Sequence, residues 1–473
     1  MDIFYSGALA LTFSKFFLAD LYPITNLKND INTQKMSVCK ERCTFFMLSE
    51  LKSRTYEAIL KEELVLAMGC TEPIAIAYAS SILRDALGEE VRFICAGLSG
   101  NIIKNVKSVI VPATGGRHGI KAAIAAGAVS SRPDLKLEVL SVLDGSSGEK
   151  IEHFLKDTEI CIEEISSACT FELLLEGKSK NHSARVNISS THTNVVEVTL
   201  DGNDVTKKYS SSVSSTEEAP PADRSLLTVE EIVEYASVAD IETLRPLLKR
   251  QIELNMAIAE EGLCGSWGAS IGKLLMSQSP DTAKKARAYA AAGSDARMSG
   301  CELPVSIISG SGNQGITSSV PVVIYARDLG KSEEELYRAL IVSNLITIHQ
   351  KTGIGTLSAY CGAISAGVGA GAGICYLLGG DFYLVAHTVV NAVAILSGTI
   401  CDGAKPSCAA KIAMAVEAGI MGYEMAKVGS QFYGGDGIVT KGVENTIRNV
   451  GRLAKDGMGE TDKEIIRIML GKN

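Results

Sequence analysis

The most constraining feature of this chain is a long stretch without charge in its second half. Between Lys351 and Asp381 there is no charged residue, and a second apolar run, 382–400, follows at once. A stretch of this length can span a bilayer. Its content is Gly and Ala rather than Leu and Phe, however, and the second run leads into a polar segment instead of a basic flank. The pattern therefore favours closely packed buried helices around a site and no membrane contact, with a membrane transporter as the alternative.

A polar segment separates two parts of the chain that differ in periodicity. Residues 210–223 are rich in Ser and Glu and contain a Pro-Pro pair, which is typical of a linker. Before it, strand-like and helical runs alternate over 47–209, and after it helical periodicity dominates over 224–473. We predict an α+β fold, in which an N-terminal α/β region with an α+β subdomain is followed by a mainly α-helical domain.

The first part contains clear local signals. A helix is expected over 73–87, because proline suits a first helical turn and Gly88 can close the other end. Cys70 would then lie just before a helix N-terminus, where the helix dipole and free amides favour a thiolate. Strand-like runs are expected at 91–96, 109–112, 184–188 and 195–199, the last two forming a hairpin around 191–194.

Composition favours a cytoplasmic enzyme. With 46% hydrophobic residues, the 473-residue chain can bury a large core, and a net charge of −8 argues against a nucleic-acid partner. The twelve cysteines are too dilute for a secreted disulfide scaffold, which favours thiol chemistry or metal ligation in a reducing compartment. Residues 1–46 read as an extension without a clean targeting signal, and Met36 or Met47 is the candidate native start.

Three cysteines in the last part of the chain are candidate metal ligands. Cys361, Cys401 and Cys408 occur there, and Gly403 and Pro406 make the chain turn between the last two. Thiolates are preferred ligands of iron-sulfur clusters, and three of them would leave one iron of a four-iron cluster without a protein ligand. Spacing alone leaves the alternative of ordinary buried thiols open.

Several longer motifs carry a family resemblance. From about residue 48 to 471 the chain resembles the L-cysteine desulfidase family, including its uncharacterised bacterial members, and more distantly the iron-sulfur L-serine dehydratases. The resemblance rests on the segments Gly69-Cys-Thr-Glu-Pro73, Leu98-Ser-Gly-Asn-Ile-Ile-Lys-Asn105, Val111-Pro-Ala-Thr-Gly-Gly116, Thr191-His-Thr-Asn194, Ser309-Gly-Ser-Gly-Asn-Gln-Gly315, Cys361-Gly362 and Cys401-Asp-Gly-Ala-Lys-Pro-Ser-Cys408. It implies a [4Fe-4S] cluster on Cys361, Cys401 and Cys408, with Cys70 as proton acceptor.

The implied reaction is a β-elimination. L-Cysteine would give pyruvate, ammonia and hydrogen sulfide, with the open iron binding the leaving group and Cys70 taking the weakly acidic Cα proton. Pyridoxal phosphate is not needed. L-Serine deamination by the same chemistry is the close alternative, and a cluster-bearing sensor or storage protein without turnover is another. The expected partner is a small amino-acid substrate, and a homodimer is left open.

Polar segments supply candidates for binding that substrate. Residues 310–315 match a dinucleotide fingerprint, but Pro321 lies in the helix that should follow, and no acidic residue is placed to hold a ribose. A turn that presents backbone amides to a substrate carboxylate is the better interpretation. Lys405, inside the cysteine octet, could offset thiolate charge. The predicted substrate-binding residues are Ser99, Asn101, His192, Thr193, Asn194, Asn313 and Gln314.

Overall fold

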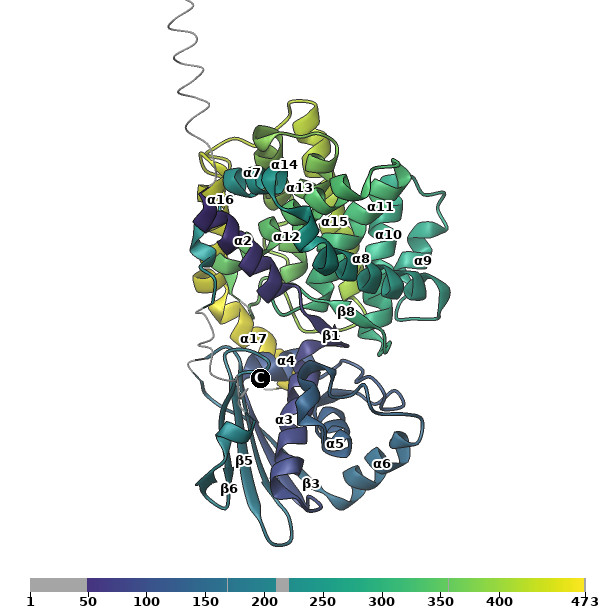
Figure 1. Cartoon of the computed structure of the whole chain (residues 1–473), viewed down its shortest axis with the longest axis vertical. Coiled ribbons are helices and arrows are strands. Elements are labelled where there is room, and N and C mark those ends of the chain that lie inside the picture. The colour runs from purple at the N-terminus through teal and green to yellow at the C-terminus, as the bar shows by residue number, and fades with distance from the viewer. Residues whose placement is uncertain (1–48, 168, 210–220, 356, 472–473) are drawn as a thin grey trace, which may run out of the picture. The chain divides into compact units, whose positions relative to one another are not determined.

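The computed structural model describes residues 49–167, 169–209, 221–355 and 357–471 (Figure 1). The chain divides into two units, Met1–Ser49 and Glu50–Asn473, and all that follows concerns the second. The predicted extension and most of the predicted linker, 210–220, lie outside the described residues. The separate domains predicted over 47–209 and 224–473 therefore stay a prediction.

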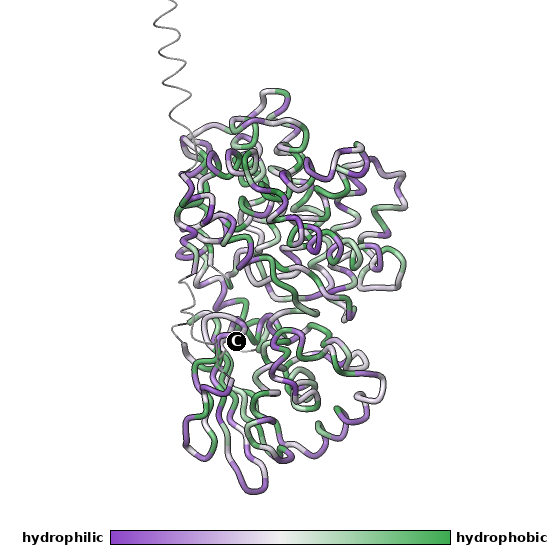
Figure 2. Tube along the Cα trace, viewed as in Figure 1, coloured by the Kyte–Doolittle hydropathy of each residue, from purple (hydrophilic) through white to green (hydrophobic). Residues whose placement is uncertain are grey.

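A mixed sheet forms the core of the N-terminal part. Its strand order is β3-β2-β4-β5-β6-β7, with β2 and β3 parallel and the other neighbours antiparallel. Apolar and polar residues alternate along its strands (Figure 2), so one face is buried and the other is open. The strands are β2 (Phe93–Leu98), β3 (Glu159–Glu164), β4 (Glu172–Lys178), β5 (Ser183–Ser189), β6 (Val195–Leu200) and β7 (Asn203–Asp204).

Helices cover the buried face of this sheet. Leu83 of α3 (Thr71–Leu87) packs on Gly177 of β4, and the Ser80 hydroxyl donates to the Ile124 carbonyl of α5 (Gly119–Ser130) at 2.7 Å. The other helices of this part are α4 (Gly100–Val106) and α6 (Ser147–Asp157).

The helix over 73–87 and the hairpin are confirmed by α3 and by β5 and β6. The strand expected at 91–96 begins two residues later, as β2. The strand expected at 109–112 is wrong, because only Ile110 makes a bridge, to His118.

The C-terminal part is a packed group of helices, which confirms the predicted fold class. Helices α13 and α15 approach closely at small residues, since a Cβ on Gly371 would lie 2.6 Å from the carbonyl carbon of Gly419. The helices are α7 (Val229–Val238), α8 (Ile241–Cys264), α9 (Ile271–Met276), α10 (Thr282–Met298), α11 (Gly312–Asp328), α12 (Glu333–Ile354), α13 (Gly362–Leu377), α14 (Phe382–Leu396), α15 (Cys408–Lys427), α16 (Val443–Arg452) and α17 (Gly459–Leu470).

Helix α13 lies within the charge-free stretch and α14 within the apolar run after it, and they are 16 and 15 residues long. Among the described residues, no helix has both the length and the apolar content that crossing a membrane requires.

Two early elements pack against this helical part rather than the sheet. The ring of Tyr56 in α2 (Glu50–Glu63) meets Tyr235 of α7 edge to face, with centroids 5.5 Å apart. Strand β1 (Leu66–Met68) pairs antiparallel with β8 (Pro304–Ser306), as Figure 1 shows. Because β8 leads into α11 from a two-stranded antiparallel ribbon, the glycine-rich turn at 310–315 has no dinucleotide-binding βαβ context.

Candidate active site

Cys70 stands at the N-cap of α3, as the sequence predicts. It is buried, and its thiol donates to the Glu72 carboxylate at 3.2 Å. The same carboxylate accepts from Thr71 at 3.1 Å and from the Asn105 amide at 3.0 Å, so its position is well fixed.

Two surrounding influences oppose the thiolate that the helix terminus is expected to favour at Cys70. Burial raises the pKa of the Cys70 thiol well above its usual value, and the negative charge of Glu72 raises it further. The positive charge of Arg297 acts in the opposite direction but is the smaller influence. Burial and Glu72 therefore favour the thiol form of Cys70, which donates its hydrogen bond to Glu72.

The chain brings Cys361 and Cys401 together through a short antiparallel bridge. Tyr360 pairs with Ile400, and the Cys361 amide donates to the Thr399 carbonyl at 3.0 Å. Cys408 then begins α15 after the turn at Gly403. That glycine has φ +94°, and a Cβ on it would collide with the Lys104 carbonyl, so the predicted turn needs glycine here.

The thiols of this trio influence one another. A hydrogen bond between Cys361 and Cys401 raises the pKa of Cys361 and lowers the pKa of Cys401, whose thiolate is also favoured by Lys104 and Lys411. Burial raises the pKa of the Cys408 thiol. Lys405, which is predicted to offset thiolate charge, pairs with Asp402. The Asp402 carboxylate also accepts from Lys411 at 2.7 Å.

All four predicted cysteines line one cavity of about 100 Å³, here called the inner cavity. Four helices begin at its wall, since Cys70, Ser311 and Cys361 are the N-cap residues of α3, α11 and α13 and Cys408 is the first residue of α15. None of these helices has a side-chain cap at its N-cap. The free amides and positive ends of four helices thus favour negative charge in the inner cavity.

This environment fits an iron-sulfur cluster on the trio. Three thiols supply soft ligands, helix N-termini and the nearby Lys351 and Lys411 compensate their charge, and the thiol contact between Cys361 and Cys401 places two ligands side by side. In a four-iron cluster each thiolate binds a different iron, so the three need not meet at one point.

A different group of potential ligands lies on the sheet. Within the described residues, Cys95, Cys161 and Glu163 have ligand atoms that all lie within 4.8 Å of one another. Cys95 and Cys161 are register partners on β2 and β3, on the face opposite the core. Neither of these two cysteines lines the inner cavity.

The predicted substrate-binding residues are divided among three places. Asn313 and Gln314 line the inner cavity, where each has a buried amide oxygen without a hydrogen-bond partner. Ser99 and Asn194 make structural contacts instead: Ser99 donates to the Thr170 carbonyl at 3.1 Å, and Asn194 donates to the Ser189 carbonyl at 2.9 Å.

Asn101 lines neither this cavity nor the one described next, although its amide oxygen is buried without a partner.

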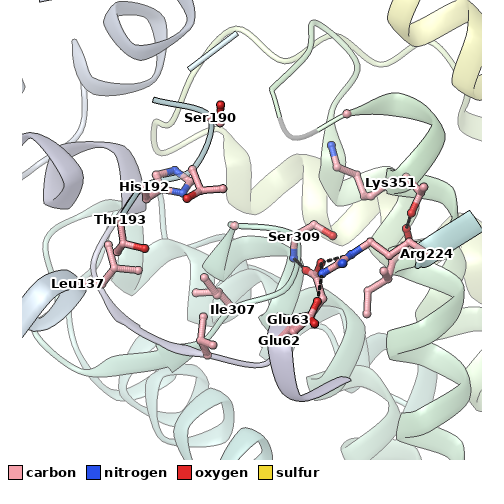
Figure 3. Close-up of a pocket in the computed structure, with 16 residues that line it drawn as sticks. Glu62, Glu63, Leu137, Ser190, His192, Thr193, Arg224, Ile307, Ser309 and Lys351 are labelled. Atoms are coloured by element: carbon pink, nitrogen blue, oxygen red, sulfur yellow. Dashed lines mark hydrogen bonds and ion pairs between the residues drawn. The ribbon is translucent and has the colours of Figure 1, made fainter. Parts of the chain in front are cut away.

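His192 and Thr193 line a larger cavity of about 530 Å³, here called the outer cavity (Figure 3). The buried His192 ring stacks edge to face on Phe171 with centroids 4.8 Å apart, and burial lowers the pKa of its imidazole. Its Nε2 has no hydrogen-bond partner. Across the cavity, Arg224 pairs with Glu63 at 2.7 Å. Lys351 lines both cavities, so it marks where they meet.

Three buried charged residues of the inner cavity escaped the sequence analysis: Glu72, Arg297 and Lys351. Glu72 lies within the same motif as Cys70 and could have been found from it. Arg297 and Lys351 come from the last turns of α10 and α12, and no local motif marks them. Burial lowers the pKa of Lys351 to about 8, against the opposing influence of Cys401 and Cys361.

Comparison with known proteins identifies the family of this chain. The family described as serine dehydratase alpha chain matches residues 190–467, which include the cysteine trio, and the chain belongs to this family. Several relatives of the chain carry the name UPF0597 protein. UPF0597 protein DSY1109 of Desulfitobacterium hafniense is 52% identical over 422 residues, covering 89% of this chain and 97% of that protein. A relative from Finegoldia magna is 46% identical, covering 89% and 100%.

Proposed function

We propose that the protein is an iron-sulfur lyase that eliminates sulfide from L-cysteine, giving pyruvate, ammonia and hydrogen sulfide. The observation that carries this proposal is the inner cavity, where Cys70 from α3 lines the same space as Cys361, Cys401 and Cys408. Membership of the serine dehydratase alpha chain family supports the reaction type, a β-elimination from a small amino acid.

The trio and Cys70 would each serve one part of the reaction. A cluster held by the trio would supply a Lewis acid for the leaving group. Cys70, which lines the same cavity, would take the Cα proton after passing its own proton to Glu72, which already accepts its hydrogen bond at 3.2 Å. Arg297 would favour the Cys70 thiolate during this exchange, because its charge lowers the pKa of that thiol. Released aminoacrylate would hydrolyse to pyruvate and ammonia.

L-Serine dehydration is the second candidate. The description of the matched family favours it directly, whereas the Gly69-to-Pro73 motif with its cysteine favours the desulfidase. Both reactions would use the same groups and differ only in whether sulfur or oxygen leaves.

Anaerobic reconstitution with iron and sulfide provides the test. The protein is assayed for sulfide from L-cysteine and for pyruvate from L-cysteine and L-serine. Sulfide and pyruvate in equal amounts from L-cysteine would support the desulfidase, and pyruvate from L-serine alone would support the dehydratase. Activity with neither amino acid would refute the proposed function.

A further inference from the structure

Arg297 is the most unusual charged group of the inner cavity. It is only 2% exposed, and its Nε is buried without a hydrogen-bond partner. A buried guanidinium with an unpaired donor is costly, unless an anion completes it.

The position of Arg297 increases this need for an anion. Its guanidinium lies against the first turn of α11, because a Cβ on Gly312 would be 2.8 Å from its Cζ. A cation is unfavourable at the positive end of a helix, yet Gly312 leaves room there for the Arg297 guanidinium. The amide oxygens without partners on Asn313 and Gln314 belong to the same helical turn and line the same cavity. One cation and two acceptors therefore converge on one small space.

These groups match the headgroup of an α-amino acid. A carboxylate pairs with a guanidinium through two parallel hydrogen bonds, and amide oxygens accept from an ammonium. We propose that Arg297 binds the α-carboxylate of the substrate in the inner cavity, while Asn313 and Gln314 accept hydrogen bonds from its α-ammonium. The substrate class rests on the proposed function.

The alternative anchor is Lys351, which is also buried at this cavity. Cys361 and Cys401 influence the pKa of Lys351, so Lys351 lies near the trio. Arg297 instead influences the pKa of Cys70. The carboxylate and the acidic proton are both attached to Cα. The carboxylate anchor should therefore be the cation beside the proton acceptor, and Lys351 is left to balance the thiols.

The test measures binding of two probes that lack a leaving group, L-alanine and L-alaninamide, by calorimetry on reconstituted protein. Wild type should bind L-alanine and reject the amide. Arg297→Gln should weaken L-alanine binding about 100-fold, as expected when one partner of a buried charge pair is removed. Arg297→Lys, which keeps the charge but loses the fork, should recover part of the affinity.

Two controls keep the result specific. Arg287→Gln removes a guanidinium from the same helix that pairs instead with Glu417 at 2.7 Å, and it should bind L-alanine like wild type. Lys351→Met should still distinguish the acid from the amide. The cluster absorbance and Tm of each variant establish that it is folded.

Each other outcome has a definite meaning. The assignment of Arg297 is overturned by unchanged L-alanine binding in Arg297→Gln, by loss of the acid preference in Lys351→Met alone, or by wild type that binds neither probe. Selective L-alanine binding without turnover of cysteine or serine would keep the carboxylate site and refute the lyase.

Discussion

The protein holds two groups of neighbouring thiols in opposite surroundings. Cys361, Cys401 and Cys408 face a buried cavity ringed by helix N-termini and lysines. Cys95 and Cys161 lie on the open face of the sheet beside Glu163, and Glu176 is the register partner of Cys95 on β4.

The different surroundings shift the pKa values of Cys401 and Cys95 in opposite directions. In the cavity, a hydrogen bond from Cys361 and nearby lysines lower the pKa of Cys401. On the sheet, burial, the contact with Cys161 and the two glutamates raise the pKa of Cys95. The ligand atoms of the sheet group lie within 4.8 Å of one another, whereas the lysines near the cavity favour the thiolate of Cys401, although the pKa values of Cys361 and Cys408 are raised. The proposed assignment of the cluster to the trio therefore rests on the charge around the thiols and not on their nearness.

The largest expected effect separates the two groups by cofactor content. Cys401→Ser should abolish the visible absorbance of the reconstituted cluster, because it removes a ligand from the cavity. Cys95→Ser is the matched control and should keep the full absorbance. A Cys401→Ser protein as brown as wild type, or a colourless Cys95→Ser protein, would reverse the assignment of the two groups.

The next effect concerns Cys70, which lines the same cavity as the trio. Cys70→Ala should keep the absorbance and lose turnover by roughly 10²- to 10⁴-fold, the range for removal of a general base. Steady-state pyruvate formation measures it. If the variant turned over at the wild-type rate, Cys70 would not be the proton acceptor, and if no variant or wild type turned over, a sensor or storage role would be favoured.

A third prediction compares the thiols without the cofactor. In protein prepared without iron, iodoacetamide pulses across a pH series should alkylate Cys401 at lower pH than Cys95, since the thiolate is the reactive form and the two pKa values move in opposite directions. Peptide mass spectrometry gives the pH of half-modification at each site, and the exposed Cys169 reports reagent activity. The reverse order would contradict the electrostatic contrast.

The smallest effect tests the acidic surroundings of the sheet group. Glu163→Gln removes a negative charge that raises the pKa of Cys95, so alkylation of Cys95 should move to lower pH, by less than about one unit for so exposed a charge. Glu159→Gln on the same strand should leave it unchanged. If the pH of Cys95 alkylation shifted equally in both variants, the cause would be the overall net charge and not the position of Glu163.

Sequence reasoning succeeded where the determining interactions are local. Proline in the first turn and Gly88 at the end are enough to define α3, and the residues around 191–194 define the hairpin. Sequence reasoning failed where the determining interactions join residues that are distant in sequence. The strand expected at 109–112 had suitable residues but no neighbouring strand to pair with beyond one bridge.

The same distinction holds for the site. The position of Cys70 at a helix start was predictable, but the pKa of its thiol also depends on burial and on Glu72 and Arg297, which no local pattern shows. Arg297 reaches the inner cavity only because Gly312, in another helix, leaves room for it.

The central claim is that the cavity places an iron of the cluster and the substrate beside each other. Mössbauer spectra of the ⁵⁷Fe-reconstituted protein, recorded before and after addition of L-cysteine to Cys70→Ala, test this most directly. We expect one of the four irons to change its spectrum and the other three to keep theirs. Four unchanged irons at saturating L-cysteine would contradict the account.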